Sequence, residues 1–269
     1  MDVFTDTPYL GNPVAVVLGA DGLSAEQMQL VARWTNLSET AFVLAPRAGG
    51  ADYRVRIFTP ARELPFAGHP TLGTCHAWLE AGGRPADLGS IVQECEAGLI
   101  TVRRTGAGLA FAAPPLVRSG PVEEAVAERV ARTLNIARSD IADIAWADNG
   151  PGWIAVLLAS AEAVLAVQRP VTLDLDIGVT GPYPAGSPEA IEVRAFSPKI
   201  TSIEDPVTGS LNASLGQWLL ESGRITAPYV ASQGTAMGRR GRVHVSRDAD
   251  GQVWVGGGTV TCVSGTVEL

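Results

Sequence analysis

The pattern of apolar and polar positions along this chain predicts many short strands and a few helices. Residues 25–35 have the apolar spacing of a surface helix, and Ser24 stands where an N-cap is expected. Further helices are expected at 122–134 and 161–168. Short runs of strand type occur at 53–60, 91–95, 99–103, 109–112, 153–160, 191–198 and repeatedly after residue 228. Because interleaved parallel strand–helix–strand units are not evident, the pattern favours an α+β fold.

One phrase occurs twice in the chain. Residues 55–79 and 193–219 both open with a strand pattern that ends in Phe-Thr-Pro or Phe-Ser-Pro. A loop follows, and polar residues then precede a helical stretch: Gly68-His69-Pro70 in the first copy and Glu204-Asp205-Pro206 in the second. A repeat spaced by about half the chain, and present only twice, favours two related halves that share one site.

The duplication predicts two domains, 1–115 and 116–269, with the last strand able to return to the first half. The Ala-Pro-Pro segment at 113–115 is the expected crossover. Each domain has one unusual helix, expected to start at Pro70 or Pro206, with no formally charged residue before its last position. Surface helices carry a polar stripe, so we expect each of these two helices to lie enclosed within a curled sheet.

Composition excludes several classes of protein. A formal net charge of −8 argues against nucleic-acid binding, which needs clustered cations. Lys199 is the single lysine, so Schiff-base chemistry is disfavoured and we expect no cofactor. The longest apolar stretch, 153–167, contains Glu162 and is too short to span a bilayer. The three cysteines and three histidines lack metal-ligand spacing; the odd cysteine count and the absence of a leader pattern predict a cytoplasmic protein without a metal site.

The candidate chemistry lies at the starts of the two uncharged helices. Asp205 before Pro206 predicts a helix cap, and His69 before Pro70 repeats that geometry with a weaker cap. Accessible amides at a helix start bind anions such as a carboxylate. Glu39, just ahead of an apolar strand, is expected to be partly desolvated, which suits it to proton transfer. Each residue alone has an ordinary explanation: a cap, a structural histidine or a solvated loop carboxylate.

Several motifs together resemble the phenazine-biosynthesis isomerase (PhzF-like) family. They run in the family's order over nearly the whole chain: GNPVAVVL, NLSETAFVL, RIFTPARELPFAGHPTLGT, EDPVTGS, QGTAMGR and VWVGGGTV. The resemblance implies a fold like that of diaminopimelate epimerase. Such a fold is α+β, with two pseudo-symmetric domains, each a mixed sheet or barrel wrapped around a central apolar helix, and with the site in the cleft between them.

The resemblance also implies roles for named residues. The best-known member isomerises a dihydro-hydroxyanthranilate ring without a cofactor, and a glutamate moves the proton. By motif that glutamate is Glu39, while His69 and Asp205 are implied as hydrogen-bonding or proton-handling partners. The positions implied to hold the substrate carboxylate are Gly68, Gly209 and Ser210.

The cysteines separate this chain from the epimerases of the same fold, which use two opposed thiols. Cys75 falls in a predicted helix, and Cys95 and Cys262 fall in predicted strands, so all three are expected to be small core residues. Three polar residues on the central helices depart from the expected pattern or extend it, with roles in the pocket left open: His76, Asn212 and Gln217.

The sequence therefore favours a cofactor-independent isomerase that moves a proton between carbons of a small, cyclic or aromatic-like carboxylate. Two alternatives stay open: an epimerase or racemase of a small metabolite in the same fold, and a non-catalytic protein that binds a small carboxylate. Neither a nucleic acid nor a membrane is an expected partner. A homodimer is the ordinary expectation for such an enzyme.

Overall fold

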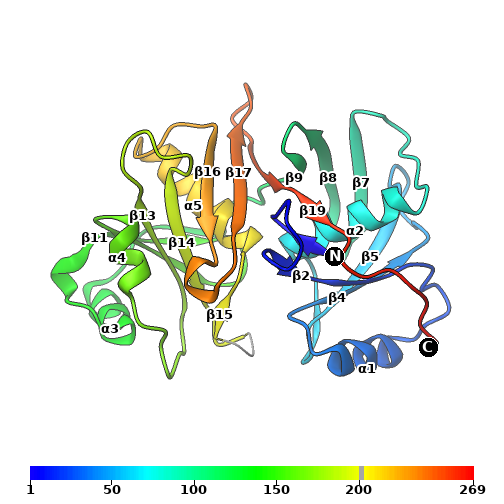
Figure 1. Ribbon diagram of the computed structural model, residues 1–269, viewed down its shortest axis with the longest axis horizontal. Helices are drawn as coiled ribbons and strands as arrows, with labels where there is room; N and C mark the ends of the chain where they lie inside the picture. Colours follow the sequence, from blue (N-terminus) through cyan, green and yellow to red (C-terminus); the bar gives the residue numbers. More distant parts are fainter. Residues whose placement is uncertain (200–202) are drawn as a thin grey trace. The chain divides into compact units, whose positions relative to one another are not determined.

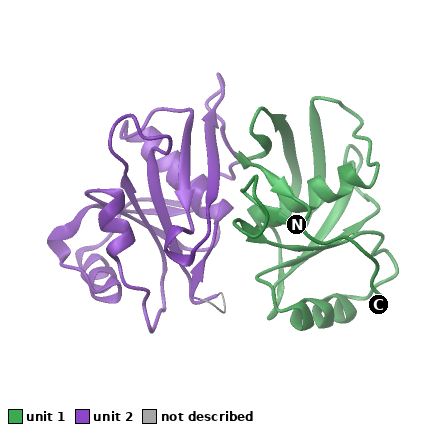
Figure 2. Cartoon of the chain, in the orientation of Figure 1, with its two compact units in different colours: residues 1–112, 256–269 green, residues 113–255 purple. Residues whose placement is uncertain are grey.

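The computed structural model describes residues 1–199 and 203–269, which form two compact units (Figure 1). Figure 2 shows unit 1, residues 1–112 and 256–269, and unit 2, residues 113–255. The chain thus leaves unit 1 immediately before the Ala-Pro-Pro segment at 113–115, and its last residues belong to unit 1.

Unit 1 contains a mixed sheet, a small second sheet and two helices. The helices are α1 (Ala25–Thr35) and α2 (Gly68–Glu80). The larger sheet has the order β9 (Gly108–Ala112), β8 (Gly98–Thr105), β7 (Ser90–Cys95), β5 (Tyr53–Phe58), β4 (Thr40–Leu44), β3 (Ala15–Val17), with β6 (Glu63–Leu64) paired to β5. The smaller sheet has the order β19 (Thr259–Val260), β1 (Asp2–Val3), β2 (Asn12–Pro13). Ser24 caps α1 through a capping box, as predicted.

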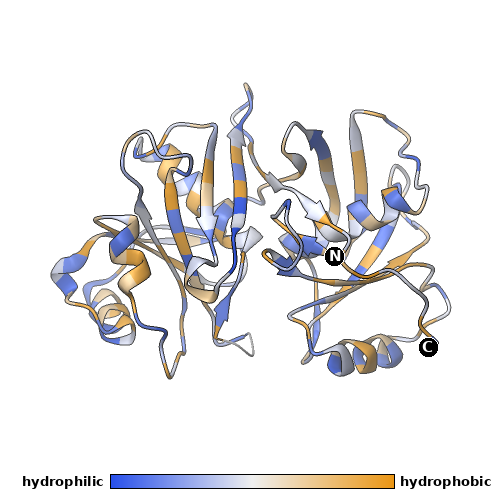
Figure 3. Ribbon diagram, viewed as in Figure 1, coloured by the Kyte–Doolittle hydropathy of each residue, from blue (hydrophilic) through white to orange (hydrophobic). Residues whose placement is uncertain are grey.

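Unit 2 repeats this arrangement with three helices. They are α3 (Glu124–Leu134), α4 (Ala161–Ala166) and α5 (Gly209–Glu221), with short 3-10 turns at Arg138–Asp140 and Thr235–Met237. Its strands follow the order β10 (Arg118–Pro121), β11 (Ile141–Asp148), β12 (Trp153–Leu158), β13 (Asp176–Pro182), β14 (Ile191–Phe196), β16 (Tyr229–Gln233), β17 (Gly241–Arg247), β18 (Val253–Gly257), with β15 (Glu204–Asp205) paired to β14. Figure 3 shows apolar and polar residues alternating along β17, whose apolar positions Val243 and Val245 are buried.

Four parallel strand pairs enclose a helix in their crossover, so the expectation that such units are absent is wrong. The pairs are β3–β4 around α1, β5–β7 around α2, β12–β13 around α4 and β14–β16 around α5. The sequence hid one of them because β13 contains Gly178 and Gly181, residues atypical of strands. A Cβ at Gly178 would lie 2.2 Å from Leu211 of α5, and one at Gly181 would lie 2.4 Å from the Ser160 carbonyl. Close packing requires both glycines, and the mixed α+β class is confirmed.

The two uncharged helices are the buried central helices of their units, as predicted. Helix α2 packs against β3, β4, β7 and β9, and α5 packs against β11, β12 and β17. Their starts differ from the prediction. Ala67 is the N-cap of α2 and Thr208 is that of α5, and neither makes a side-chain capping bond. Asp205 is not a cap, because Glu204 and Asp205 first form strand β15 against β14.

Candidate active site

Glu39 and His69 lie side by side in unit 1. Glu39 precedes β4, and His69 is in the first turn of α2. The His69 Nε2 atom is 3.4 Å from the Glu39 Oε2 atom, and the two side chains are 6% and 12% exposed. On the other side of the ring, the side-chain amide of the buried Asn12 lies 3.3 Å from Nδ1. The imidazole is therefore held between a carboxyl group and an amide.

Burial keeps the His69 ring neutral. Loss of solvation lowers its pKa to about 3, a hydrogen bond to the Pro13 carbonyl opposes that shift, and the positive N-terminus adds to it. The contact with Glu39 is accordingly not an ion pair at neutral pH, although its distance would allow one. A neutral imidazole has one nitrogen that donates and one that accepts. The tautomer of the ring therefore decides whether Nε2 donates to the Glu39 carboxylate or accepts from its protonated form.

In unit 2, Asp205 is fixed by a buried polar network. Its Oδ2 atom accepts a hydrogen bond of 2.6 Å from the Thr208 hydroxyl. The Gln233 amide donates to the Thr208 hydroxyl at 2.9 Å and to the Asp205 carbonyl at 3.1 Å. The Gln233 side-chain oxygen accepts from the Thr208 backbone N–H at 3.0 Å and from the Asn212 side-chain amide at 2.8 Å. Since all four side chains are at least nine-tenths buried, the network specifies one geometry for Asp205.

Ser210, in the first turn of α5, is oriented by two neighbours. The indole N–H of the buried Trp153 donates to its hydroxyl oxygen at 3.1 Å. Asn149 donates to its backbone carbonyl at 2.9 Å. Because indole can only donate, the Ser210 hydroxyl proton is left to donate elsewhere. Gly209 precedes Ser210 as the first residue of α5, and Gly68 is the first residue of α2. The six residues proposed from the sequence thus fall into two sets, Glu39, Gly68 and His69 in unit 1 and Asp205, Gly209 and Ser210 in unit 2.

Three residues that contact these two sets or belong to the Asp205 network were not predicted from the sequence: Asn12, Trp153 and Gln233. Two of them could have been found from the sequence, because Asn12 lies in the motif GNPVAVVL and Gln233 lies in the motif QGTAMGR. Asn212, whose role was open, belongs to the Asp205 network. His76 contacts Glu80 at 3.2 Å and Thr261 at 3.1 Å, away from His69's partners.

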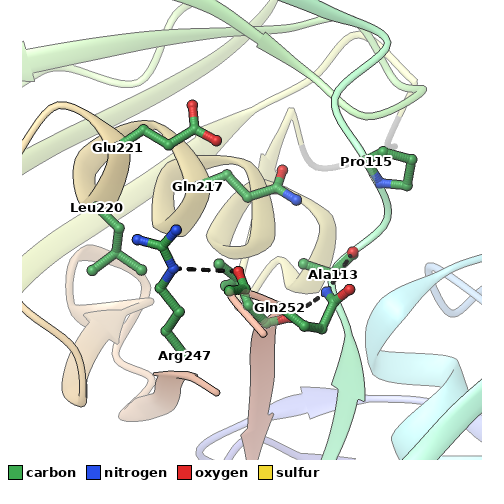
Figure 4. Close-up of a pocket in the computed structure, with 9 residues that line it drawn as sticks. Ala113, Pro115, Gln217, Leu220, Glu221, Arg247 and Gln252 are labelled. Carbon is green, nitrogen blue, oxygen red and sulfur yellow. Dashed lines mark hydrogen bonds between the residues drawn. The ribbon is translucent and has the colours of Figure 1, made fainter. Parts of the chain in front are cut away.

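Gln217 lies elsewhere, at a hollow of about 170 Å³ in unit 2 (Figure 4). Its side-chain amide donates to the Pro114 carbonyl at 3.0 Å. A second hollow, of about 630 Å³ in unit 1, is lined by β3, the end of α2 and residues 261–269. Neither hollow includes the six proposed residues. Within residues 1–199 and 203–269, no cluster of histidine, cysteine and acidic side chains is arranged to hold a metal ion. No helix in the same ranges is long and apolar enough to cross a membrane.

The cysteines are only partly as predicted. Cys75 and Cys95 are buried, and burial raises the pKa of the Cys75 thiol to about 12 and also raises that of Cys95. Cys262 is wrong as a core strand residue: it follows β19 and is partly exposed.

Comparison with known proteins gives the family of this chain. The family model described as "Phenazine biosynthesis-like protein" matches residues 1–265, and the chain belongs to this family. The resemblance inferred from the motifs is confirmed.

The individual relatives cover nearly all of the chain. It is 38% identical to "Antisense-enhancing sequence 1" of Schizosaccharomyces pombe, over 98% of this chain and 96% of the relative. It is 35% identical to the trans-2,3-dihydro-3-hydroxyanthranilate isomerase of Pseudomonas fluorescens, over 100% and 98% of the two chains. A crystal structure of a PhzF-family protein from Bacillus anthracis matches with a TM-score of 0.79 at 26% identity, over 95% and 93%. The expected fold is therefore confirmed.

Proposed function

We propose that this protein is a cofactor-independent isomerase that moves one proton between two carbons of a small carboxylate. The observation that carries the proposal is the buried pair of Glu39 and neutral His69, 3.4 Å apart. Relatives with isomerase names, spanning the full chain, support the reaction class. A cyclic dihydro-hydroxyanthranilate is the first substrate to test, because one such relative is named for it.

In this proposal Glu39 is the group that takes and returns the proton. Because 12% of the Glu39 side chain is exposed, a proton taken from one carbon can exchange with water before Glu39 delivers a proton to the other carbon. In the tautomer protonated at Nε2, His69 is proposed to stabilise the Glu39 carboxylate before abstraction. Because His69 stays neutral, it adds no positive charge that would weaken Glu39 as the base in the abstraction step.

The residues of unit 2 supply the remaining functions. Asp205, fixed by Thr208 and Gln233, is proposed to handle a second proton or hydrogen bond on the substrate. The Ser210 hydroxyl and the uncapped amide at Gly209 are proposed to bind a carboxylate, and Gly68 is proposed for the same role at the start of the equivalent helix of unit 1. The raised pKa of Cys75 and Cys95 disfavours thiolates as bases, which argues against a two-thiol epimerase.

The test is turnover of trans-2,3-dihydro-3-hydroxyanthranilate in D2O, followed by NMR and mass spectrometry. The wild-type protein should shift the double bonds and place deuterium at the newly protonated carbon. Glu39→Gln should abolish both at unchanged far-UV circular dichroism. Glu80→Gln is the matched control, because Glu80 also contacts a histidine in unit 1 but lies outside the pair.

Three results would overturn the assignment. Deuterium incorporation by Glu39→Gln at the wild-type rate would remove Glu39 from the reaction. Inversion of a stereocentre without movement of a double bond would instead identify an epimerase. Binding without exchange by the wild-type protein, across a panel of cyclic and acyclic carboxylates, would identify a binding protein.

A further inference from the structure

A buried ion pair lies directly beside Asp205. Glu204 of β15 accepts two hydrogen bonds from the Arg194 guanidinium of β14, at 2.8 and 2.9 Å. Both side chains are 4% exposed. Arg194 also donates to the Val164 and Val167 carbonyls at the end of α4, and its guanidinium lies 4.9 Å from the centre of the Phe196 ring. Its donors are thus shared between β15 and α4.

The strand register places Glu204 and Asp205 on opposite faces of the sheet. Glu204 is opposite Phe196, and Asp205 is opposite Ala195. Residues directly opposite in a pair share a face, and successive residues alternate. Glu204 therefore points to the face of Arg194 and α4, while Asp205 points to the other face. Helix α5 covers that other face, since Gly178, paired with Ala195, lies against Leu211.

Unit 1 contains an equivalent arginine–glutamate pair, but no acidic residue follows its glutamate. Arg56 of β5 makes a bidentate pair with Glu63 of β6 at 2.7 Å, and its guanidinium lies 5.1 Å from the Phe58 ring. Glu63 is opposite Phe58, as Glu204 is opposite Phe196. The pair in unit 1 is 26% and 30% exposed, and the residue that follows Glu63 is Leu64.

We propose that the Arg194–Glu204 pair is a positioning device for Asp205, an inference that rests on the proposed function of that carboxyl. β15 has only two residues, so backbone pairing alone fixes it weakly. The bidentate fork holds Glu204 in register, and the next residue, Asp205, is thereby held where Thr208 can donate to it. Arg194 lies on the face of the sheet that Glu204 shares and Asp205 does not, so it acts through Glu204.

Stability alone is a weaker explanation for this pair. Desolvation of a buried ion pair offsets much of its attraction, and apolar replacements are often neutral for stability. In unit 1, where the apolar Leu64 follows Glu63, the equivalent Arg56–Glu63 pair is partly solvated. The fully buried pair, Arg194–Glu204, lies in unit 2, where the Asp205 carboxyl group needs a fixed position.

The test compares Arg194→Gln/Glu204→Gln, which leaves no unpaired buried charge, with the matched control Arg56→Gln/Glu63→Gln. The first readout is the carboxyl 13C resonance of Asp205, in protein labelled at aspartate and assigned with Asp205→Asn. It needs no turnover, so it decides the positioning role even if the proposed function fails. The second is kcat and KM for trans-2,3-dihydro-3-hydroxyanthranilate.

We expect the unit 2 double variant to shift the Asp205 resonance and to lower kcat about 100-fold, with KM changed less than about threefold. The unit 1 double variant should leave both unchanged. A folded unit 2 variant with the wild-type Asp205 resonance, or with wild-type kcat, would overturn the proposal. If that variant does not fold, Arg194→Lys, which keeps the charge but loses the fork, is judged by the same two readouts.

Discussion

The His69 Nε2 atom lies 3.4 Å from the Glu39 Oε2 atom, and burial keeps the imidazole neutral beside that carboxyl group. A histidine with its usual pKa near 6.5 would be part charged at neutral pH and would hold Glu39 ionised. Here the neutral imidazole and the Glu39 carboxyl group can interact by a hydrogen bond without forming an ion pair. The relationship has a measurable consequence for stability as well as for catalysis.

Stability should fall with decreasing pH because of His69. Its pKa is about 3 in the folded protein and 6.5 in the unfolded chain, so between these values the unfolded state binds one more proton. The free energy of unfolding is therefore unaffected by His69 above pH 6.5. It falls by about 1.4 kcal/mol per pH unit as the pH decreases from 6.5 towards 3. Urea unfolding of wild type and His69→Gln at pH 7, 6 and 5 should show this difference in slope.

His244 provides the comparison for that experiment, because desolvation also lowers its pKa but its side chain is exposed. His244→Gln should change the pH dependence much less than His69→Gln does. Superimposable wild-type and His69→Gln curves would contradict a buried neutral histidine.

Gln233 should matter more than its counterpart in unit 1. Gln233→Leu removes the partners of the Thr208 amide, the Thr208 hydroxyl, Asn212 and the Asp205 carbonyl. Leaving several buried polar groups unsatisfied should cost about 3 kcal/mol or more of unfolding free energy. It should also lower kcat by at least about tenfold, because Asp205 loses its fixed partner. Urea unfolding and steady-state kinetics below the transition measure the two effects.

Gln93→Leu is the comparison. Gln93 of β7 bonds Tyr53 and Thr71 at the start of α2, as Gln233 of β16 bonds Thr208 at the start of α5. We expect it to lower stability and to leave kcat within about twofold of wild type. Equal kinetic effects from both variants would show that general loosening, and not Asp205, accounts for the loss.

Local patterns and the repeat predicted much of the fold and part of the site. The Ser24-capped helix, the enclosed helices and most strands were accessible because each depends on nearby residues. The proximity of Glu39 to His69 was not, since it requires β4 to lie beside α2. Asp205 was misplaced as a cap because it lies in a two-residue strand whose partner residue, Ala195 of β14, is ten residues earlier in the chain. The strand of Gly178 was missed because its residues suit close packing and not strand propensity.

Trp153 should affect substrate binding more than turnover. Trp153→Phe keeps an aromatic ring at this buried position but removes the indole N–H that donates to the Ser210 hydroxyl. The freed hydroxyl can rotate, so its bond to a substrate carboxylate weakens by about 1 kcal/mol. We expect KM to rise about fivefold with kcat within twofold. Trp254→Phe, which removes an indole bond to Asp248, should leave KM unchanged; a rise of equal size there would exclude a specific role for Trp153.

The thiols should be dispensable for activity. Burial raises the pKa of Cys75 to about 12, so at pH 8 it is almost entirely protonated and shielded inside α2, whereas Cys262 is partly exposed. Iodoacetamide should therefore modify Cys262 first and leave Cys75 unmodified in the folded protein, with turnover retained. Peptide mass spectrometry locates the label, and the residual rate is measured on the same sample.

Cys262→Ala should abolish the early labelling at full activity, and Cys75→Ala should cost about 1 kcal/mol of stability without loss of kcat. Inactivation that follows the labelling of Cys75 or Cys95 would instead restore the thiol-based epimerase as the better assignment.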